Sequence, residues 1–164
     1  LQWWNLIFLN IFAITFAVLI SFYMARLFSW KAVTVFAALL TIMDVIQVFG
    51  TGYMGTSAEK MIQLRLPTLI LLPTFPSKIS GYVGLGLGDL FLAGLLSIQA
   101  ALKYGRRTGI LSAGTIGITF FIFEIVLLNY PSGRYFPATV IIAGGWLSGL
   151  GVHSLLETIR QHRQ

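Results

Sequence analysis

The chain contains only two aspartates, and each lies in an apolar stretch long enough to cross a membrane. Asp44 falls near the end of the stretch 31–49, and Asp89 falls near the start of the stretch 83–102. A charged side chain at the centre of a bilayer costs about 2.5–3.5 kcal/mol even on the lenient insertion scales, so such residues usually have a function. Two carboxylates that share one proton perform the chemistry of aspartyl proteolysis.

The composition places the chain among membrane proteins. Of its 164 residues, 57% are hydrophobic and 10% are charged, and the mean hydropathy is +0.85. Water-soluble domains of this length do not have such a composition. The absence of cysteine excludes disulfides and thiolate metal sites, and the two histidines, His153 and His162, lack the spacing of metal ligands. We therefore expect no metal and no cofactor.

Runs of about 20 apolar residues predict an all-α fold, a polytopic bundle of transmembrane helices. The bundle is expected to form one domain over residues 1–164. The five expected spans cover residues 3–25, 31–49, 83–102, 109–128 and 136–153. A long connection, residues 51–82, joins the second span to the third. Its apolar centre, residues 66–73, is too short to span and could be a strand, a re-entrant piece or an interfacial segment.

The basic residues predict the orientation of the bundle. The net charge of +6 is scattered over the loops, which indicates topology signals beside anionic lipid and no nucleic-acid partner. The side of the 51–82 connection carries Lys60, Arg65, Lys78 and Arg134, and the other side carries Arg26, Lys31, Lys103, Arg106, Arg107, Arg160 and Arg163. Four residues against seven put the connection outside and the C-terminus in the cytoplasm.

The two aspartates are expected at matching depths. Asp44 precedes Gly50, the expected end of its helix, by six residues, and Asp89 follows Val83, the expected start of its helix, by six residues. At ~1.5 Å per residue, each carboxylate would lie roughly 9 Å from its helix end. The same connection joins both ends, so two antiparallel neighbours would hold the carboxylates at equal depth.

The motif Gly86-Leu87-Gly88-Asp89 resembles the Gly-x-Gly-Asp signature of the intramembrane aspartyl proteases, the family of presenilin and signal peptide peptidase. Its glycines would let a peptide backbone approach the carboxylate, although they would also suit close helix packing. Asp44 stands where that family has its other aspartate, with Met43 where tyrosine is usual. Prepilin-type peptidases share the motif, but there a basic residue tends to follow soon after, whereas residues 90–94 are apolar here.

A third signature of that family is Pro-Ala-Leu at the start of the last helix. Here Pro137-Ala138-Thr139 begins the last span, with threonine in place of leucine. The resemblance covers about residues 1–155 and implies that the five spans correspond to the last five of nine helices, the catalytic half of the fold. It also implies catalytic roles for Asp44 and Asp89, supported by the residues of the two motifs.

The resemblance implies an aspartic endopeptidase in which the two aspartates activate water to cut transmembrane segments. We expect a prokaryotic homologue in the cell membrane, with transmembrane peptides or signal peptides as substrates, the lipid bilayer as surroundings and the oligomeric state left open. The alternative is a proton- or cation-coupled transporter or channel, since paired intramembrane acids also serve transport. No repeat of broken helices, the usual transporter pattern, is visible.

Three further features have two interpretations each. Glu124 lies within the fourth span and is either a third functional acid or, more in keeping with its position, a structural group. Gln47, one turn after Asp44, would bond either that carboxylate or another helix. The pair Gly145 and Gly149 has the spacing of close helix contacts, which carry no chemistry of their own.

Overall fold

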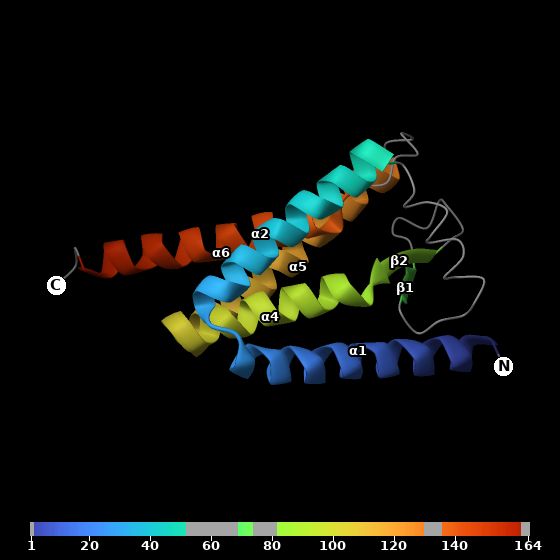
Figure 1. Cartoon of the computed structure of the whole chain (residues 1–164), viewed down its shortest axis with the longest axis horizontal. Coiled ribbons are helices and arrows are strands. Elements are labelled where there is room, and N and C mark those ends of the chain that lie inside the picture. The colour runs from blue at the N-terminus through green and yellow to red at the C-terminus, as the bar shows by residue number, and fades with distance from the viewer. Residues whose placement is uncertain (1, 52–68, 74–81, 130–135, 162–164) are drawn as a thin grey trace.

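The computed structural model describes residues 2–51, 69–73, 82–129 and 136–161 (Figure 1). Five of the described helices are long and apolar enough to cross a membrane, which confirms the predicted all-α, polytopic membrane bundle. The elements are α1 (Gln2–Leu27), α2 (Trp30–Ile46), the short π-helix η1 (Gln47–Thr51), β1 (Leu69–Pro73), β2 (Tyr82–Gly86), α4 (Leu87–Tyr104), α5 (Arg106–Asn129) and α6 (Ala138–Gln161).

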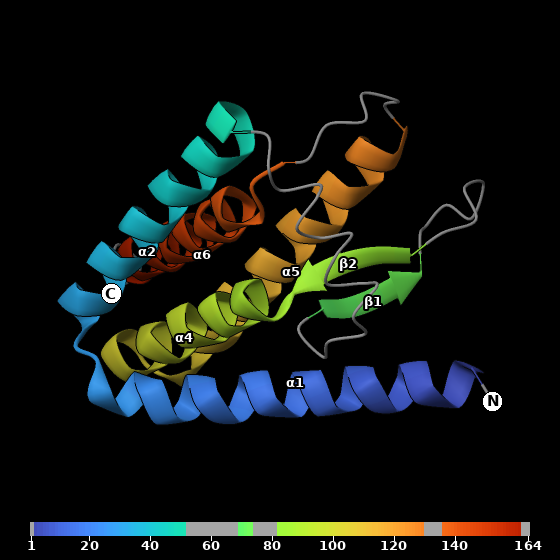
Figure 2. The same ribbon diagram turned by 45° about the vertical axis from the view of Figure 1, so that its right-hand side comes forward.

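Helix α4 lies at the centre of the bundle. It contacts α1 on one side and α2, α5 and α6 on the others (Figure 1 and Figure 2). Its residues Leu92, Leu95 and Leu96 are completely buried, whereas most large apolar residues of α1 and α2 are exposed. Lipid tails are as apolar as these side chains, so an apolar outer surface around a small packed centre is what a membrane bundle requires.

The helix that carries Asp89 begins later than the sequence predicts. We expected it to start at Val83, but residues 82–86 form strand β2 and α4 starts at Leu87. Gly84 and Gly86 weaken helix formation in this segment, since each glycine inside a helix costs roughly 0.5–1 kcal/mol relative to alanine, and pairing with β1 holds the backbone extended instead. Asp89 is therefore the third residue of α4, in its first turn, and does not lie roughly 9 Å inside a helix.

The apolar centre of the long connection contains a strand. β1 pairs with β2 in antiparallel fashion, so that Leu69 lies opposite Gly86 and Pro73 lies opposite Tyr82. β1 also lies against α1, and Ile70 is buried there. This small sheet ends directly at the start of α4. The rest of the connection, residues 52–68 and 74–81, lies outside the described residues, as does His162.

Small residues let α1 approach α4 closely. Over residues 7–27 of α1, the buried side chains are Ala13, Ala17, Ser21 and Ala25, which recur every fourth residue and so share one face. The Ser21 hydroxyl lies 2.7 Å from the Ala17 carbonyl of its own helix and 3.2 Å from the Phe91 carbonyl of α4, so these two acceptors share its one proton, and a Cβ on Gly94 would lie 2.7 Å from the hydroxyl oxygen. This contact holds α4 against α1 one turn after Asp89.

A buried glutamine ties α4 to the turn between α1 and α2. The Gln99 side-chain amide donates to the carbonyls of Ala25 and Phe28, at 2.8 Å each. Ala25 lies in the last turn of α1, where carbonyl groups have no partner within the helix, and Phe28 follows directly after α1. Gln99 therefore fixes the far ends of α1 and α2 on the helix that carries Asp89.

Helices α5 and α6 meet at the two glycines that the sequence marks as a close contact. A Cβ on Gly145 would lie 2.7 Å from Cα of Ile116, and a Cβ on Gly149 would lie 3.0 Å from Cα of Ser112. Backbone therefore packs directly on backbone along this interface. The contact sets the position of α6, whose first turn reaches the aspartates.

We predict that Gly145→Ala destabilises the protein by about 1–3 kcal/mol, because the new methyl group would overlap the backbone of α5. The matched control is Gly144→Ala, which adds the same methyl group one residue earlier, where no atom lies within 4 Å. Thermal unfolding of both variants in one detergent gives the comparison. Equal midpoints for the two variants would contradict close packing of α5 on α6.

Candidate active site

Asp44 lies in the last turn of α2 and is bonded to the start of α6. Its side chain is buried, with 8% of the residue exposed. The Thr139 hydroxyl donates to Asp44 Oδ2 at 2.6 Å, and the Thr139 backbone N–H donates to the same oxygen at 3.3 Å. Two donors from one residue of α6 thus compensate the burial of this carboxyl group.

The local sequence explains why α6 presents donors at this point. Pro137 is buried and has no N–H, and α6 begins at the next residue, Ala138. The first N–H groups of a helix have no partner inside that helix. The Asp44 carboxyl oxygen accepts the one from Thr139 and so caps α6 from another helix.

Asp89 lies where β2 passes into α4. Gly86 is the residue that precedes α4, and the Asp89 side chain hydrogen-bonds back to its backbone. This is half of a capping box, in which the third helical residue reaches the residue before the helix. Leu87 and Gly88 form the intervening first two positions, and Asp89 itself is half-buried.

The two motif glycines have different surroundings. A Cβ on Gly86 would lie 2.8 Å from Asp89 Oδ2, so only glycine leaves the carboxyl group in its place. Gly88 is exposed, and a Cβ there would meet no atom within 4 Å. Gly86 therefore serves the carboxyl group, whereas Gly88 leaves open space beside it.

The carboxyl groups of Asp44 and Asp89 come from neighbouring helices and are close enough for their charges to interact. Thr139 of α6 also lies at this point, where its hydroxyl donates to Asp44. Helices α2, α4 and α6 therefore converge on two acidic side chains within a membrane bundle. Within the described residues, no group of three or more His, Cys, Asp or Glu side chains could hold a metal ion.

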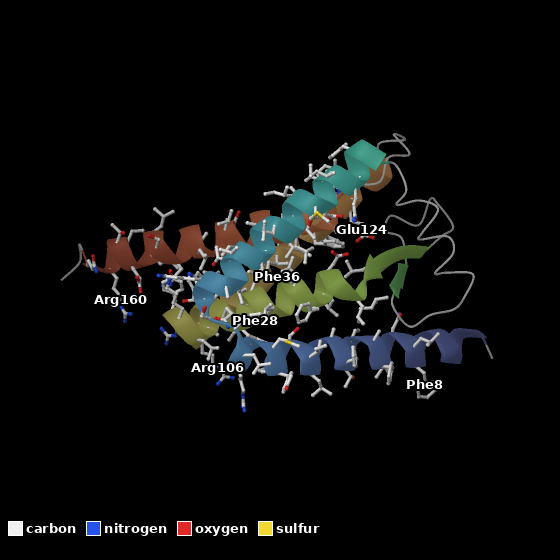
Figure 3. The ribbon with its side chains drawn as sticks, in the orientation of Figure 1. Phe8, Phe28, Phe36, Arg106, Glu124 and Arg160 are labelled. Carbon is white, nitrogen blue, oxygen red and sulfur yellow. The ribbon has the colours of Figure 1, made fainter. Side chains whose placement is uncertain are left out.

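Glu124 and Gln47 occupy the same end of the bundle. Glu124 is half-buried on α5 and lies toward the end that carries the strands, opposite to Arg106 and Arg160 (Figure 3). Its neighbour Phe123 packs on Phe136 with ring centroids 4.4 Å apart, directly before Pro137. Gln47 is the first residue of η1 and is exposed.

Sequence reasoning did not find the bond between Thr139 and Asp44. The only signal was a hydroxyl residue at the position of leucine in the Pro-Ala-Leu signature that residues 137–139 resemble. It also did not find Ser21, whose hydroxyl reaches the α4 backbone near Asp89.

Met43, which precedes Asp44 at the position where the family signature has tyrosine, has 57% of its surface exposed.

A five-helix membrane bundle that brings two carboxyl groups together in this way has the features of a membrane-embedded protease. Comparison with known families makes the assignment specific: the family model for signal peptide peptidase matches residues 2–164. The chain belongs to the signal peptide peptidase family, which is presenilin-like and consists of intramembrane aspartyl proteases. Neither the curated proteins nor the solved structures that were searched gave a match.

We predict that Gly86→Ala lowers peptide cleavage on the order of 10²-fold, since a displacement of about 1 Å at a reacting group has effects of this size. The added methyl group would displace the Asp89 carboxyl group, which is the end of a side chain and can move without unfolding the helix. The thermal midpoint should therefore stay close to that of the unmodified protein. A variant that cleaves at the original rate would show that Gly86 does not position Asp89.

Proposed function

We propose that this protein is an aspartic endopeptidase that hydrolyses peptide bonds within transmembrane segments, with Asp44 and Asp89 as its catalytic pair. One observation carries the proposal: the two aspartates of the chain, one from α2 and one from α4, lie within reach of each other's charge in a member of the signal peptide peptidase family. No observation favours the transporter alternative.

The proposed mechanism follows from the charges. Two neighbouring carboxyl groups cannot both ionise cheaply, so the pair holds one proton and titrates as a unit. The ionised member takes a proton from water, and the water oxygen attacks the carbonyl carbon of the substrate. The protonated member hydrogen-bonds the carbonyl oxygen, and the leaving nitrogen then receives a proton from the pair.

The strands offer a means of holding an unwound substrate. A peptide bond inside a helix is shielded, so the substrate must be extended at the cleaved bond. A two-stranded sheet leaves an outer edge on each strand, and an extended peptide can add to such an edge through main-chain hydrogen bonds. β2 ends at Gly86, directly before the turn that carries Asp89, which makes this sheet a suitable platform. The backbone beside Pro137 is a second candidate.

The proposed orientation puts the strands outside and the C-terminus in the cytoplasm. The described basic residues agree with it, because Arg26, Lys103 and Arg160 lie in the last turns of α1, α4 and α6. These turns are at the end of the bundle away from the strands (Figure 1). With this orientation in a prokaryotic cell membrane, suitable substrates are single spans with a cytoplasmic N-terminus, such as signal peptides left in the membrane.

We predict that Asp44→Asn and Asp89→Asn each reduce cleavage of a labelled transmembrane peptide by on the order of 10⁴-fold or more. The double variant should be little worse than either single variant, because a pair that acts as one unit is already lost when one member is removed. All three proteins are to be compared at equal folded concentration in the same lipid. Substantial activity in either single variant would exclude the catalytic pair.

We predict that a cysteine placed at Ser57, in the long connection, reacts with a membrane-impermeant thiol reagent in intact cells. The chain has no cysteine of its own, so no background labelling arises from it. The matched control is Gln161→Cys at the exposed end of α6, which should react only after lysis. The opposite pattern would reverse the orientation and remove the reason to favour signal peptides, without touching the proposed chemistry.

A further inference from the structure

The two aspartates of the site are held in unequal ways. Asp44 Oδ2 accepts both the hydroxyl and the backbone N–H of Thr139. Asp89 has the hydrogen bond to the Gly86 backbone. A pair that holds one proton will place it on the member whose charged form is less well stabilised. The difference between the hydrogen-bond donors of Asp44 and Asp89 therefore influences which aspartate is ionised and can activate water.

The bonds to Asp44 fit a charged oxygen. A backbone N–H can only donate, so Oδ2 is an acceptor in this arrangement. The hydroxyl bond to that same oxygen is 2.6 Å long, which is the range of O–H···O⁻ bonds. Oδ2 itself therefore carries no proton, and because hydrogen bonds to a charged acceptor are about twice as strong as those to a neutral one, both donors stabilise the ionised carboxylate more than the protonated form.

Asp44 of α2 lies beside the first turn of α6, and this position also favours its charged form. Thr139 is the second residue of α6, a helix of 24 residues, and the N-terminal end of a helix stabilises negative charge. Burial opposes ionisation, and Asp44 is the more buried of the two aspartates. The donors of Thr139 are therefore needed if a carboxyl group this deep is to carry a charge.

Titratable groups around Asp44 are few. Of the elements packed against α2, helix α4 contributes Asp89 in its first turn and Lys103 and Tyr104 in its last turn, while the described titratable residues of α6 are His153, Glu157 and Arg160, in its second half. On α5, Glu124 lies at the same end of the bundle as the site (Figure 3). The described cations of α4 and α6, Lys103 and Arg160, lie in the last turns of those helices, whereas the aspartates lie by their first turns, so neutral donors must supply the stabilisation.

We propose that Thr139 is a positioning residue that keeps Asp44 as the ionised, water-activating aspartate and leaves the shared proton on Asp89. The proposal rests on the catalytic pair proposed above. Asp44 takes a proton from water while the water oxygen bonds to the carbonyl carbon, and Asp89 gives its proton to the carbonyl oxygen. When the C–N bond breaks, the nitrogen takes the proton from Asp44, and the newly formed hydroxyl returns one to Asp89. Both aspartates then have their starting states.

The hydroxyl is specific to threonine or serine at this position. The Pro-Ala-Leu signature that residues 137–139 resemble ends in leucine, which has no group that could donate to Asp44. In this chain, the described hydroxyl that bonds Asp44 is that of Thr139.

The first test separates the hydroxyl of Thr139 from its bulk. Thr139→Val keeps the shape and removes the donor, and Thr139→Ser keeps the donor and removes a methyl group. We expect Val to lower kcat about 10–100-fold with little change in KM, and Ser to stay within about threefold of the unmodified protein. A Val variant with the original kcat, or a Ser variant as impaired as Val, would overturn the proposal.

The second test reports on charge without any cleavage. An aryl epoxide forms esters with ionised carboxylates, and mass spectrometry of the digested protein gives the ratio of esterified Asp44 to esterified Asp89. We expect Thr139→Val to lower this ratio several-fold and Thr139→Ser to preserve it. An unchanged ratio in the Val variant would overturn the proposal. If the unmodified protein cuts no peptide, the proposed protease function fails, whereas the labelling ratio still decides the role of Thr139.

Discussion

The bonds from Thr139 to Asp44 are the interaction on which the site depends. They connect α6 to α2 across 95 residues of sequence, at a point where a carboxyl group is buried in the bundle. A buried carboxyl group without hydrogen-bond partners is costly, and the donors of α6 offset that cost for Asp44. The same contact gives the Thr139 backbone N–H, which has no acceptor inside α6, a hydrogen-bond partner. The same hydrogen bonds thus fix the start of α6 against α2 and supply the donors to the Asp44 carboxyl group.

The hydrogen bonds between Thr139 and Asp44 require that the helices keep fixed positions relative to one another. Close contacts at small residues hold them there. In a membrane no hydrophobic force drives helices together, so close packing and hydrogen bonds must do so. Ser21 meets α4 at Gly94, and Gly145 lies on the α5 backbone at Ile116. The first contact holds the helix of Asp89, and the second holds the helix of Thr139. The proposed catalytic geometry therefore depends on close contacts at small residues as well as on the buried leucines of α4.

The sequence predicted the bundle well because apolar length alone identifies a membrane span. It misplaced the start of the helix of Asp89, because short apolar segments such as residues 83–86 fit a strand and a helix equally. The spacing of Gly145 and Gly149 predicted a close contact but not its partner, α5. The Thr139 bond to Asp44 could not be predicted, since nothing in the sequence says which face of α6 turns toward α2.

The central claim is that Asp44 and Asp89 share one proton, and carbon-13 NMR of the aspartate carboxyl groups tests it most directly. The chain has only these two aspartates, so selective labelling gives two carboxyl signals and no others. The account predicts that both signals respond together during a pH titration, and that Asp89→Asn alters the titration of Asp44. Two independent titrations, with that of Asp44 unchanged by the substitution, would contradict it.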